Sequence, residues 1–478
     1  MSHSKRTVIK KIAKNLCFLL CLFETSAYSQ TVNTISQTDK IYGLSTFWKE
    51  ARVNFVYLNK FGAAKWDATY QSFIPRILAT TSDYNYYREL QQFCALLKDG
   101  HTNVYLPERF NEMTSQFGSY RFFVENIENK AVITCINASK VMEIPIGSEI
   151  IEVNGLSTND YIDKYVSPFM SSSTDYSLRN MCVYRLLSGL PGSTYHIKIR
   201  RIDRKIILLT LTHSKTIEKE FIPKTFLDFQ EFNFKWLKNG VAYIAINSFE
   251  HRSIDSLFTA VLPELRKARG LIVDLRLNGG GNSNFATDIL EYLTNDSVLH
   301  GAISLARENN STLRAWGASI TPSDTSNGNP AWGLSKSILR KAYLMARDSF
   351  LVPVDYNTDT VRLKAKRLII PTVILMGNQT ASAAEDFLIY ADNQRHMTRI
   401  GDRSFGSTGQ PISFDLPGGG SGRVCAKMDT YPNGKLFVGV GVLPQIYVRN
   451  TLKDLLAGKD AVLDFATEFI TKELNHKK

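Results

Sequence analysis

Residues 372–385 read Thr-Val-Ile-Leu-Met-Gly-Asn-Gln-Thr-Ala-Ser-Ala-Ala-Glu, and this stretch decides the fold class. Its first five residues are apolar or β-branched and, together with the residues from 368 onward, predict a buried strand. A turn follows, and residues 382–393 predict a helix. A strand, a turn and a helix in this order are typical of an α/β sheet. Ser382 is therefore expected at the carboxyl edge of a sheet, where a helix begins.

Two roles are open to Ser382 at this position. The positive end of a helix and its unpaired N–H groups stabilise a developing oxyanion, which favours a nucleophile. A serine followed three residues later by Glu385 is also typical of a capping box, in which both side chains pair with helix N–H groups. The local pattern alone leaves both interpretations open.

A glycine-rich turn follows a second apolar run. Residues 274–281 read Asp-Leu-Arg-Leu-Asn-Gly-Gly-Gly. Glycines let the backbone approach a ligand closely and present N–H groups without obstruction. The turn lacks the Gly-Lys-Ser or Gly-Lys-Thr ending and the Gly-x-Gly-x-x-Gly spacing of nucleotide-binding loops. A ligand-binding loop and a plain turn remain as alternatives, and nucleotide binding is disfavoured.

Strand and helix patterns alternate over residues 236–470, which predicts one α/β core. Residues 309–334 contain two Trp and many turn residues, so we expect an insertion, or a lid over the sheet, at about 302–350. The expected strands are 241–246, 271–275 and 368–376, and the expected helices are 253–267, 284–293, 336–349 and 382–393.

Two smaller domains precede the core. Residues 30–115 are expected to be helical, because apolar side chains recur at three- and four-residue intervals from Tyr86 to Leu97. An Asp-Gly pair ends that helix and leaves His101 on a turn. Residues 116–215 instead predict a small β domain, with strands at 131–136, 149–153, 195–200 and 206–212.

The first 29 residues have the layout of a secretory signal peptide. Five basic residues precede the apolar run 16–23, and small residues at 27 and 29 predict a mature start at Gln30. The run is too short to span a bilayer, so we expect an exported protein, periplasmic or extracellular, without a stable membrane span. A lipid anchor is disfavoured because Leu precedes both Cys17 and Cys21.

Composition narrows the function classes. With 44% hydrophobic and 21% charged residues, the 478-residue chain is long enough for about three folded domains. Without residues 1–29 it keeps 52 Lys and Arg against 44 Asp and Glu, dispersed along the sequence, which argues against a nucleic-acid surface. Four scattered cysteines remain, and their spacing argues against a zinc site; disulfides and buried thiols both stay open.

Six motifs in order resemble the family of C-terminal processing (tail-specific) peptidases, the tricorn core and the interphotoreceptor retinoid-binding protein modules. The resemblance spans residues 40–465 and implies an α/β multidomain fold with a PDZ-like domain at 116–215 and a crotonase-like sheet in the core. The motifs are Asp99-Gly100-His101-Thr102, the PDZ-like piece, Asp274-Leu275-Arg276 with its glycines, Thr380-Ala381-Ser382-Ala383-Ala384-Glu385, Gly401-Asp402-Arg403-Ser404-Phe405-Gly406 and Gly439-Val440-Gly441-Val442-Leu443-Pro444.

The resemblance implies a serine peptidase that needs no metal or cofactor. Ser382 would be the nucleophile, and the N–H groups of Gly280 or Gly281 and of Ala383 would form the oxyanion hole. Relatives with a Ser/Lys dyad carry a lysine where this chain has Ser407. The chain therefore resembles the tricorn-like branch, in which a histidine, here His101, is the general base.

The chain departs from that branch at two positions. Tricorn-type enzymes have a serine before the histidine and a glutamate before the last motif, where this chain has Gly100 and Val438. Asp99 and Glu385 are the candidates for an acidic partner of His101.

We expect hydrolysis of peptides or unfolded proteins, held by the PDZ-like domain. The alternative is a non-catalytic binding protein of the same fold, which holds a hydrophobic ligand or a peptide.

Overall fold

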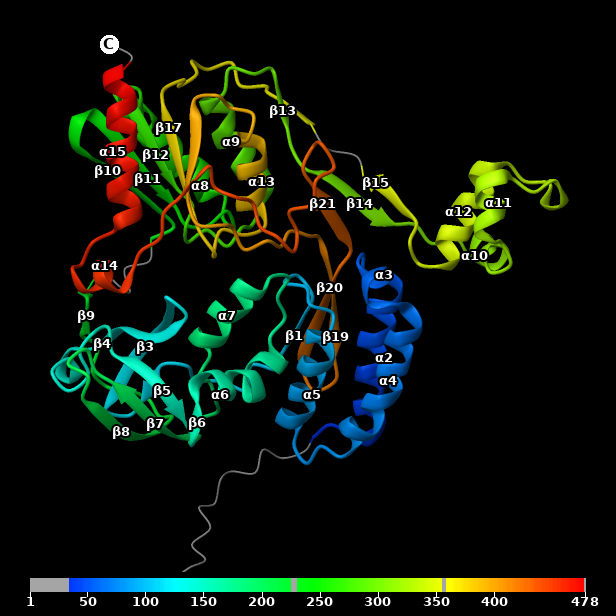
Figure 1. Cartoon of the computed structure of the whole chain (residues 1–478), viewed down its shortest axis with the longest axis horizontal. Coiled ribbons are helices and arrows are strands. Elements are labelled where there is room, and N and C mark those ends of the chain that lie inside the picture. Colours follow the sequence, from blue (N-terminus) through cyan, green and yellow to red (C-terminus); the bar gives the residue numbers. More distant parts are fainter. Residues whose placement is uncertain (1–33, 225–229, 355–357, 477–478) are drawn as a thin grey trace, which may run out of the picture.

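The computed structural model describes residues 34–224, 230–354 and 358–476 (Figure 1). The signal peptide expected at 1–29 lies outside these ranges. Within them, no helix combines the length and the apolar character that crossing a membrane requires.

Helices form the amino-terminal part, as predicted. Ser36 and Ser82 cap two of them, each accepting the N–H of the third residue that follows. Tyr86, Leu90 and Phe93 are fully buried along one helix face. The helices are α2 (Gln37–Asn54), α3 (Leu58–Phe61), α4 (Ala63–Leu78) and α5 (Asp83–Ala95).

The next part is a β-sheet with two helices. The four predicted strands are confirmed as β4, β5, β7 and β8, and the sheet runs in the order β2-β3-β4-β5-β7-β8. Its strands are β2 (Gln116–Phe117), β3 (Tyr120–Ile127), β4 (Lys130–Asn137), β5 (Glu149–Val153), β6 (Leu156–Ser157), β7 (Thr194–Arg200), β8 (Ile206–Thr212) and β9 (Phe221–Ile222), and its helices are α6 (Thr158–Tyr165) and α7 (Asp175–Tyr184).

A six-stranded sheet is the centre of the α/β core. Its order is β10-β11-β12-β17-β18-β22, parallel except for β10 at one edge. Its strands are β10 (Phe232–Trp236), β11 (Val241–Ile246), β12 (Gly270–Asp274), β17 (Thr372–Met376), β18 (Met397–Gly401) and β22 (Ile446–Tyr447). The predicted strand at 368–376 begins only after Pro371, whose missing N–H cannot pair in a ladder.

Helices cover both faces of this sheet (Figure 1). Alternation along the strands explains the two layers, because Ile374 packs into the core beneath one face while Val373 and Leu375 pack on the opposite face with Val462 and Ile470. The covering helices are α8 (Ser253–Leu265), α9 (Ser283–Leu293) and α13 (Ala383–Ala391) on one side and α15 (Ala461–His476) on the other, with α14 (Leu452–Leu456) before α15.

Two consecutive strands, β20 (Gly420–Cys425) and β21 (Lys427–Thr430), connect the core to the histidine turn and to the insertion. β20 pairs with β1 (Asn103–Tyr105), and β21 pairs with β14 (Ile303–Arg307). In Figure 1 these strands run beside the amino-terminal helices. The remaining strands are β13 (Val298–His300), β15 (Leu351–Val354), β16 (Thr358–Thr360) and β19 (Pro411–Leu416).

The expected lid does not cover the sheet. Helices α10 (Ser311–Gly317), α11 (Pro322–Asn327) and α12 (Lys336–Ala346) project beyond β14 and β15, away from the six-stranded sheet (Figure 1). They enclose a small core of their own around Ile320 and Leu339. Residues 302–350 are thus an insertion whose helices lie at the periphery.

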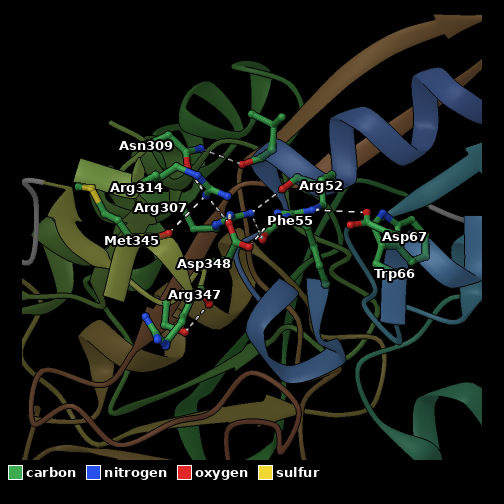
Figure 2. A network of polar contacts seen from close by, with 12 residues as sticks. Arg52, Phe55, Trp66, Asp67, Arg307, Asn309, Arg314, Met345, Arg347 and Asp348 are labelled. Carbon is green, nitrogen blue, oxygen red and sulfur yellow. Dashed lines mark hydrogen bonds and ion pairs between the residues drawn. The ribbon is translucent and has the colours of Figure 1, made fainter. Parts of the chain in front are cut away.

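Asp348 holds this insertion against the amino-terminal helices (Figure 2). The buried carboxylate accepts hydrogen bonds from Arg52 of α2 at 2.8 Å, from Arg307 at 2.6 Å and from Arg314 of α10 at 2.5 Å. The Arg307 guanidinium also donates to the carbonyl of Phe55. The ion pairs explain why the insertion lies beside α2 rather than over the sheet, since a buried carboxylate must stay paired.

Of the two alternatives for the mature cysteines, the structure has buried thiols. Cys94, Cys135, Cys182 and Cys425 are all free and buried.

Candidate active site

Ser382 lies at the amino end of α13 in a backbone conformation unusual for serine. Its φ is 55° and its ψ is −122°. Thr380 holds the preceding turn, because its Oγ1 donates to the Leu275 carbonyl at 2.8 Å and accepts the Gly377 N–H at 3.0 Å. A non-glycine residue at positive φ costs about 1–3 kcal/mol and persists only where surrounding contacts hold it. The turn between β17 and α13 is thus a sharp elbow with Ser382 at its tip.

His101 lies opposite this elbow. The buried Asp99 carboxylate accepts the His101 backbone N–H at 3.1 Å and the Thr102 hydroxyl at 2.7 Å. Thr102 Oγ1 in turn accepts the Cys425 N–H of β20 at 3.0 Å, which fastens the histidine turn to the core. His101 Nε2 lies 3.3 Å from Ser382 Oγ, so the structure brings together two residues that are 281 positions apart.

Ser407 contacts the other ring nitrogen of His101. Its Oγ lies 2.8 Å from Nδ1, and the serine is fully buried. When Nδ1–H donates to this hydroxyl, Nε2 is left as an acceptor for the hydroxyl of Ser382. Ser382, His101 and Ser407 thus lie in a row of polar contacts, in which a hydroxyl stands where a Ser-His-Asp triad has a carboxylate.

The two carboxylates expected to orient His101 do not contact its ring in the described residues. Asp99 binds the backbone of the histidine. Glu385 Oε2 accepts the N–H groups of Ser382 and Ser407, each at 3.1 Å. The expectation of an acidic partner is thus not met by either residue, because both carboxylates are occupied by other donors.

Glu385 instead ties the elbow to the loop that carries Ser407. Its Oε1 accepts the Ser404 hydroxyl at 2.5 Å and the Gly406 N–H at 2.8 Å. Burial raises the pKa of Glu385 to about 7, while these hydrogen bonds act in the opposite direction. One buried carboxyl group therefore holds the backbone of both Ser382 and Ser407, the two serines that contact His101.

The glycine turn packs directly on the elbow. A Cβ added at Gly280 would lie 2.7 Å from the Cβ of Ser382 and 3.1 Å from the nitrogen of Ala383, so only glycine fits. The Gly280 N–H donates to the side chain of Asn278 at 2.8 Å, whereas the Gly281 N–H has no acceptor among the described residues. Ala383 begins α13, where N–H groups have no partner within the helix. Of the three predicted donors, Gly280 is therefore already engaged.

Burial lowers the pKa of His101 to about 4, and the positive charges of Arg423 and Lys427 act in the same direction. Asp429 opposes them. The imidazole is therefore neutral at neutral pH and free to accept a proton.

Sequence reasoning assigned no role to Asn278 and Ser404. The Asn278 side chain donates to the Ile246 carbonyl at 3.0 Å, and its own carbonyl accepts the Ala381 N–H at 3.0 Å. Ser404 Oγ donates to Glu385 and accepts the Val442 N–H at 2.7 Å. Both residues lie inside the motifs that carry the resemblance. A polar side chain among glycines and apolar residues is the sequence feature that could have indicated their structural role.

The β domain reaches this site through the segment before α7. Ser173 Oγ accepts the Gly100 N–H at 2.9 Å, next to His101. Thr174 Oγ1 donates to the Phe405 carbonyl at 3.1 Å, close to Ser407. The segment thus contacts both the histidine turn, at Gly100, and the loop that carries Ser407, at Phe405.

Arg276, in the Asp274-Leu275-Arg276 motif, has a structural place. Its guanidinium binds Asp274 at 2.6 Å and Asp460, just before α15, at 2.7 Å. The motif therefore anchors the carboxyl-terminal helix to β12.

The α/β core resembles known proteins in sequence and in fold. Residues 240–448 match the family described as Peptidase family S41. No curated protein matches the chain. The fold is shared with mature CPAF complexed with lactacystin, at 15% identity and a TM-score of 0.65 over 92% of this chain and 99% of that one.

Two further solved structures align at lower scores. The photosystem II D1 C-terminal processing protease is 15% identical, with a TM-score of 0.46 over 86% of this chain and 93% of that one. The tricorn protease is also 15% identical, with a TM-score of 0.42 over 92% of this chain and 37% of that one.

Proposed function

Because residues 240–448 place this chain in peptidase family S41 and make it a serine-type peptidase, we propose that it cleaves peptide bonds with Ser382 as nucleophile and His101 as general base. The observation that carries the assignment is the 3.3 Å distance between His101 Nε2 and Ser382 Oγ. Catalytic hydrogen bonds are often long before substrate binds, so this distance suits a base and its nucleophile.

In the proposed reaction, Ser382 Oγ attacks the scissile carbonyl carbon and its proton moves to His101 Nε2. The imidazolium then gives this proton to the leaving amine, and an acyl-enzyme ester remains. A water molecule gives a proton to the same nitrogen and attacks the ester; the acid product leaves as Nε2 returns that proton to Ser382 Oγ, which restores the free enzyme. The lowered pKa of His101 keeps the imidazole neutral for the first step.

Ser407 orients the base and backbone donors receive the oxyanion. The Ser407 hydroxyl accepts Nδ1–H and so selects the tautomer that leaves Nε2 unprotonated. The N–H groups of Gly281 and Ala383 are the proposed oxyanion donors. The hydrogen bond from Gly280 to Asn278 supports this narrower choice.

We further propose that the substrates are peptides or unfolded proteins, held by the β domain as a PDZ-like module, and that the protein is exported. Strand β8 forms an edge of the β-domain sheet and exposes Ile206 and Leu208. An extended peptide pairs with such an edge. The contacts of Ser173 and Thr174 join this domain to the catalytic groups.

Labelling with a fluorophosphonate tests the nucleophile and the base separately. The wild type and a surface control, Ser323→Ala, should label equally, Ser382→Ala should not label, and His101→Ala should label much more slowly. Turnover of a casein-derived peptide should follow the same order. Labelling that persists in Ser382→Ala would overturn the nucleophile, and equal labelling of the wild type and His101→Ala would overturn the base.

A further inference from the structure

A cavity of about 280 Å³ lies behind the catalytic histidine. Its apolar walls include Phe61, Leu97 and Val438, and Asp99 and Ser173 also line it. The cavity is therefore built from the amino-terminal helices, the β domain and the last motif of the core.

The cavity adjoins the histidine turn and the loop that carries Ser407. Asp99 is two positions before His101 and binds its backbone N–H. Gly439, another lining residue, donates its N–H to the Gly406 carbonyl at 2.9 Å, next to Ser407. The side chains of His101 and Ser382 are not among the lining residues, so a molecule in the cavity would touch these neighbouring segments.

Two lysines give the cavity a positive character. Lys60 and Lys98 line it with exposed side chains, and neither makes an ion pair within the part of the chain that the structure describes. Lys60 Nζ lies 4.4 Å from the centre of the ring of Tyr57, another residue that lines the cavity. Lys98 adopts a φ of 50°, a conformation that its surroundings must hold.

The other polar groups that line the cavity do not fully compensate the positive charge of Lys60 and Lys98. Asp99 is the one acidic residue in the lining; burial raises its pKa, and it already accepts hydrogen bonds from the His101 N–H, Thr102 and Ser173. The hydroxyl of Tyr57 is buried and has no hydrogen-bond partner among the described residues. Two lysines therefore share the lining with a single acidic group whose oxygens already have donors.

From this composition we infer that the Lys60/Lys98 cavity binds a carboxylate with a short apolar tail. The lysines would pair with the carboxylate and Phe61, Leu97 and Val438 would cover the tail. The carboxylate belongs either to the end of a peptide or to a free organic acid. The first source rests on the peptidase function proposed above, and the second does not.

Binding is measured on Ser382→Ala, so the result does not depend on catalysis. The probes are hexanoate and its uncharged amide, hexanamide, followed by isothermal titration. We expect saturable binding of hexanoate and none of hexanamide. A second variant adds Lys60→Gln and Lys98→Asn, since asparagine tolerates the left-handed conformation. Its dissociation constant for hexanoate should rise about tenfold or more, as loss of charge-assisted contacts predicts.

A matched control removes two lysines from elsewhere. Lys459→Gln with Lys472→Gln makes the same change in net charge at exposed positions and should leave hexanoate binding unchanged. Equal binding of hexanoate and hexanamide, or equal loss in both double variants, would overturn the carboxylate site.

Two acetylated tetra-alanyl-leucine peptides distinguish the two sources of the carboxylate. One peptide has a free C-terminus and the other an amidated one. Tighter binding of the free acid, lost with the two cavity lysines, assigns a peptide end. Equal binding of both peptides, with hexanoate still bound, assigns a free organic acid. Fluorophosphonate labelling of the wild type separates failure of this site from failure of the proposed catalysis.

Discussion

A Cβ added at Gly100 would lie 2.9 Å from the hydroxyl oxygen of Ser407, so Ser407 fills the space beside the residue before His101. The hydroxyl that contacts His101 Nδ1 comes from the core rather than from the histidine turn.

Ser407→Ala should therefore lower kcat and leave KM nearly unchanged. In the proposed mechanism the hydroxyl orients the base from the Nδ1 side, opposite Ser382, and loss of one such hydrogen bond corresponds to about a tenfold change in rate. Steady-state kinetics on a peptide substrate measures the two constants. The surface control Ser323→Ala should match the wild type. A rise in KM at constant kcat would contradict this role.

Gly100→Ala and Ser407→Gly should be coupled in a double-mutant cycle. The new methyl group would meet Ser407 Oγ at 2.9 Å and the Phe405 ring at 2.7 Å, and removal of the Ser407 side chain relieves the first contact. Overpacking of this kind costs about 1–3 kcal/mol, and contacting residues couple by a similar amount. Denaturant unfolding of the four proteins gives the coupling free energy. Additive effects would mean that the two residues do not share this space.

Ser382→Gly should be more stable than Ser382→Ala. At φ 55° and ψ −122° a glycine is unstrained, whereas alanine keeps the strain, so the difference in the free energy of unfolding should be about 1 kcal/mol or more. Ser256, an exposed residue inside α8, is the control. There the order should reverse, with alanine more stable than glycine by about 1 kcal/mol.

An NMR titration of the His101 ring should give a midpoint near pH 4. In Arg423→Gln the pKa should rise, because a positive charge that opposes protonation is removed, but it should stay below 6.5, because burial is the largest cause of the shift. Arg395→Gln, an exposed position, should leave it unchanged. A fall of the pKa in Arg423→Gln would refute this electrostatic account.

The same shift makes stability depend on pH. The unfolded chain binds a proton at this histidine near pH 6.5, whereas the folded chain does so only near pH 4. The free energy of unfolding should therefore fall as the pH drops through this interval. In His101→Gln this part of the fall should be absent, which urea unfolding at several pH values measures.

Arg276→Leu should lower the free energy of unfolding by about 3–5 kcal/mol, because it leaves the buried Asp274 carboxylate without its cationic partner. Lys267→Leu is the comparison, since its ion pair with Glu264 is exposed and worth at most about 1 kcal/mol. Urea unfolding of both variants measures the contrast. Equal losses would show that the Arg276 network adds little to stability.

Local patterns were enough for the elements around Ser382 and for the four strands of the β domain. Apolar runs and turn residues mark these segments within a few positions. Strands β18 and β22 and helix α15 were not predicted, although the last packs on one whole face of the sheet. β18 and β22 are short, and α15 covers strands from distant parts of the sequence such as β11 and β12, so no local signal specifies their arrangement.

The site was predictable only in part for the same reason. His101 reaches Ser382 because β1 pairs with β20, a contact between strands about 320 residues apart. The sequence offered two candidates for an acidic partner of His101: Asp99, next to the histidine, and Glu385, next to the elbow. Both carboxylates bind backbone N–H groups instead, and only the packed structure places Ser407 against the ring.

His101 precedes Ser382 by 281 positions and lies outside residues 240–448, which match Peptidase family S41. The chain is synthesised from its amino end, so His101 emerges long before Ser382, and β20, which fastens the histidine turn, emerges later still. Under the proposed mechanism, a growing chain that still lacks β20 has no strand to fasten the histidine turn, so activity is expected only when synthesis is nearly complete.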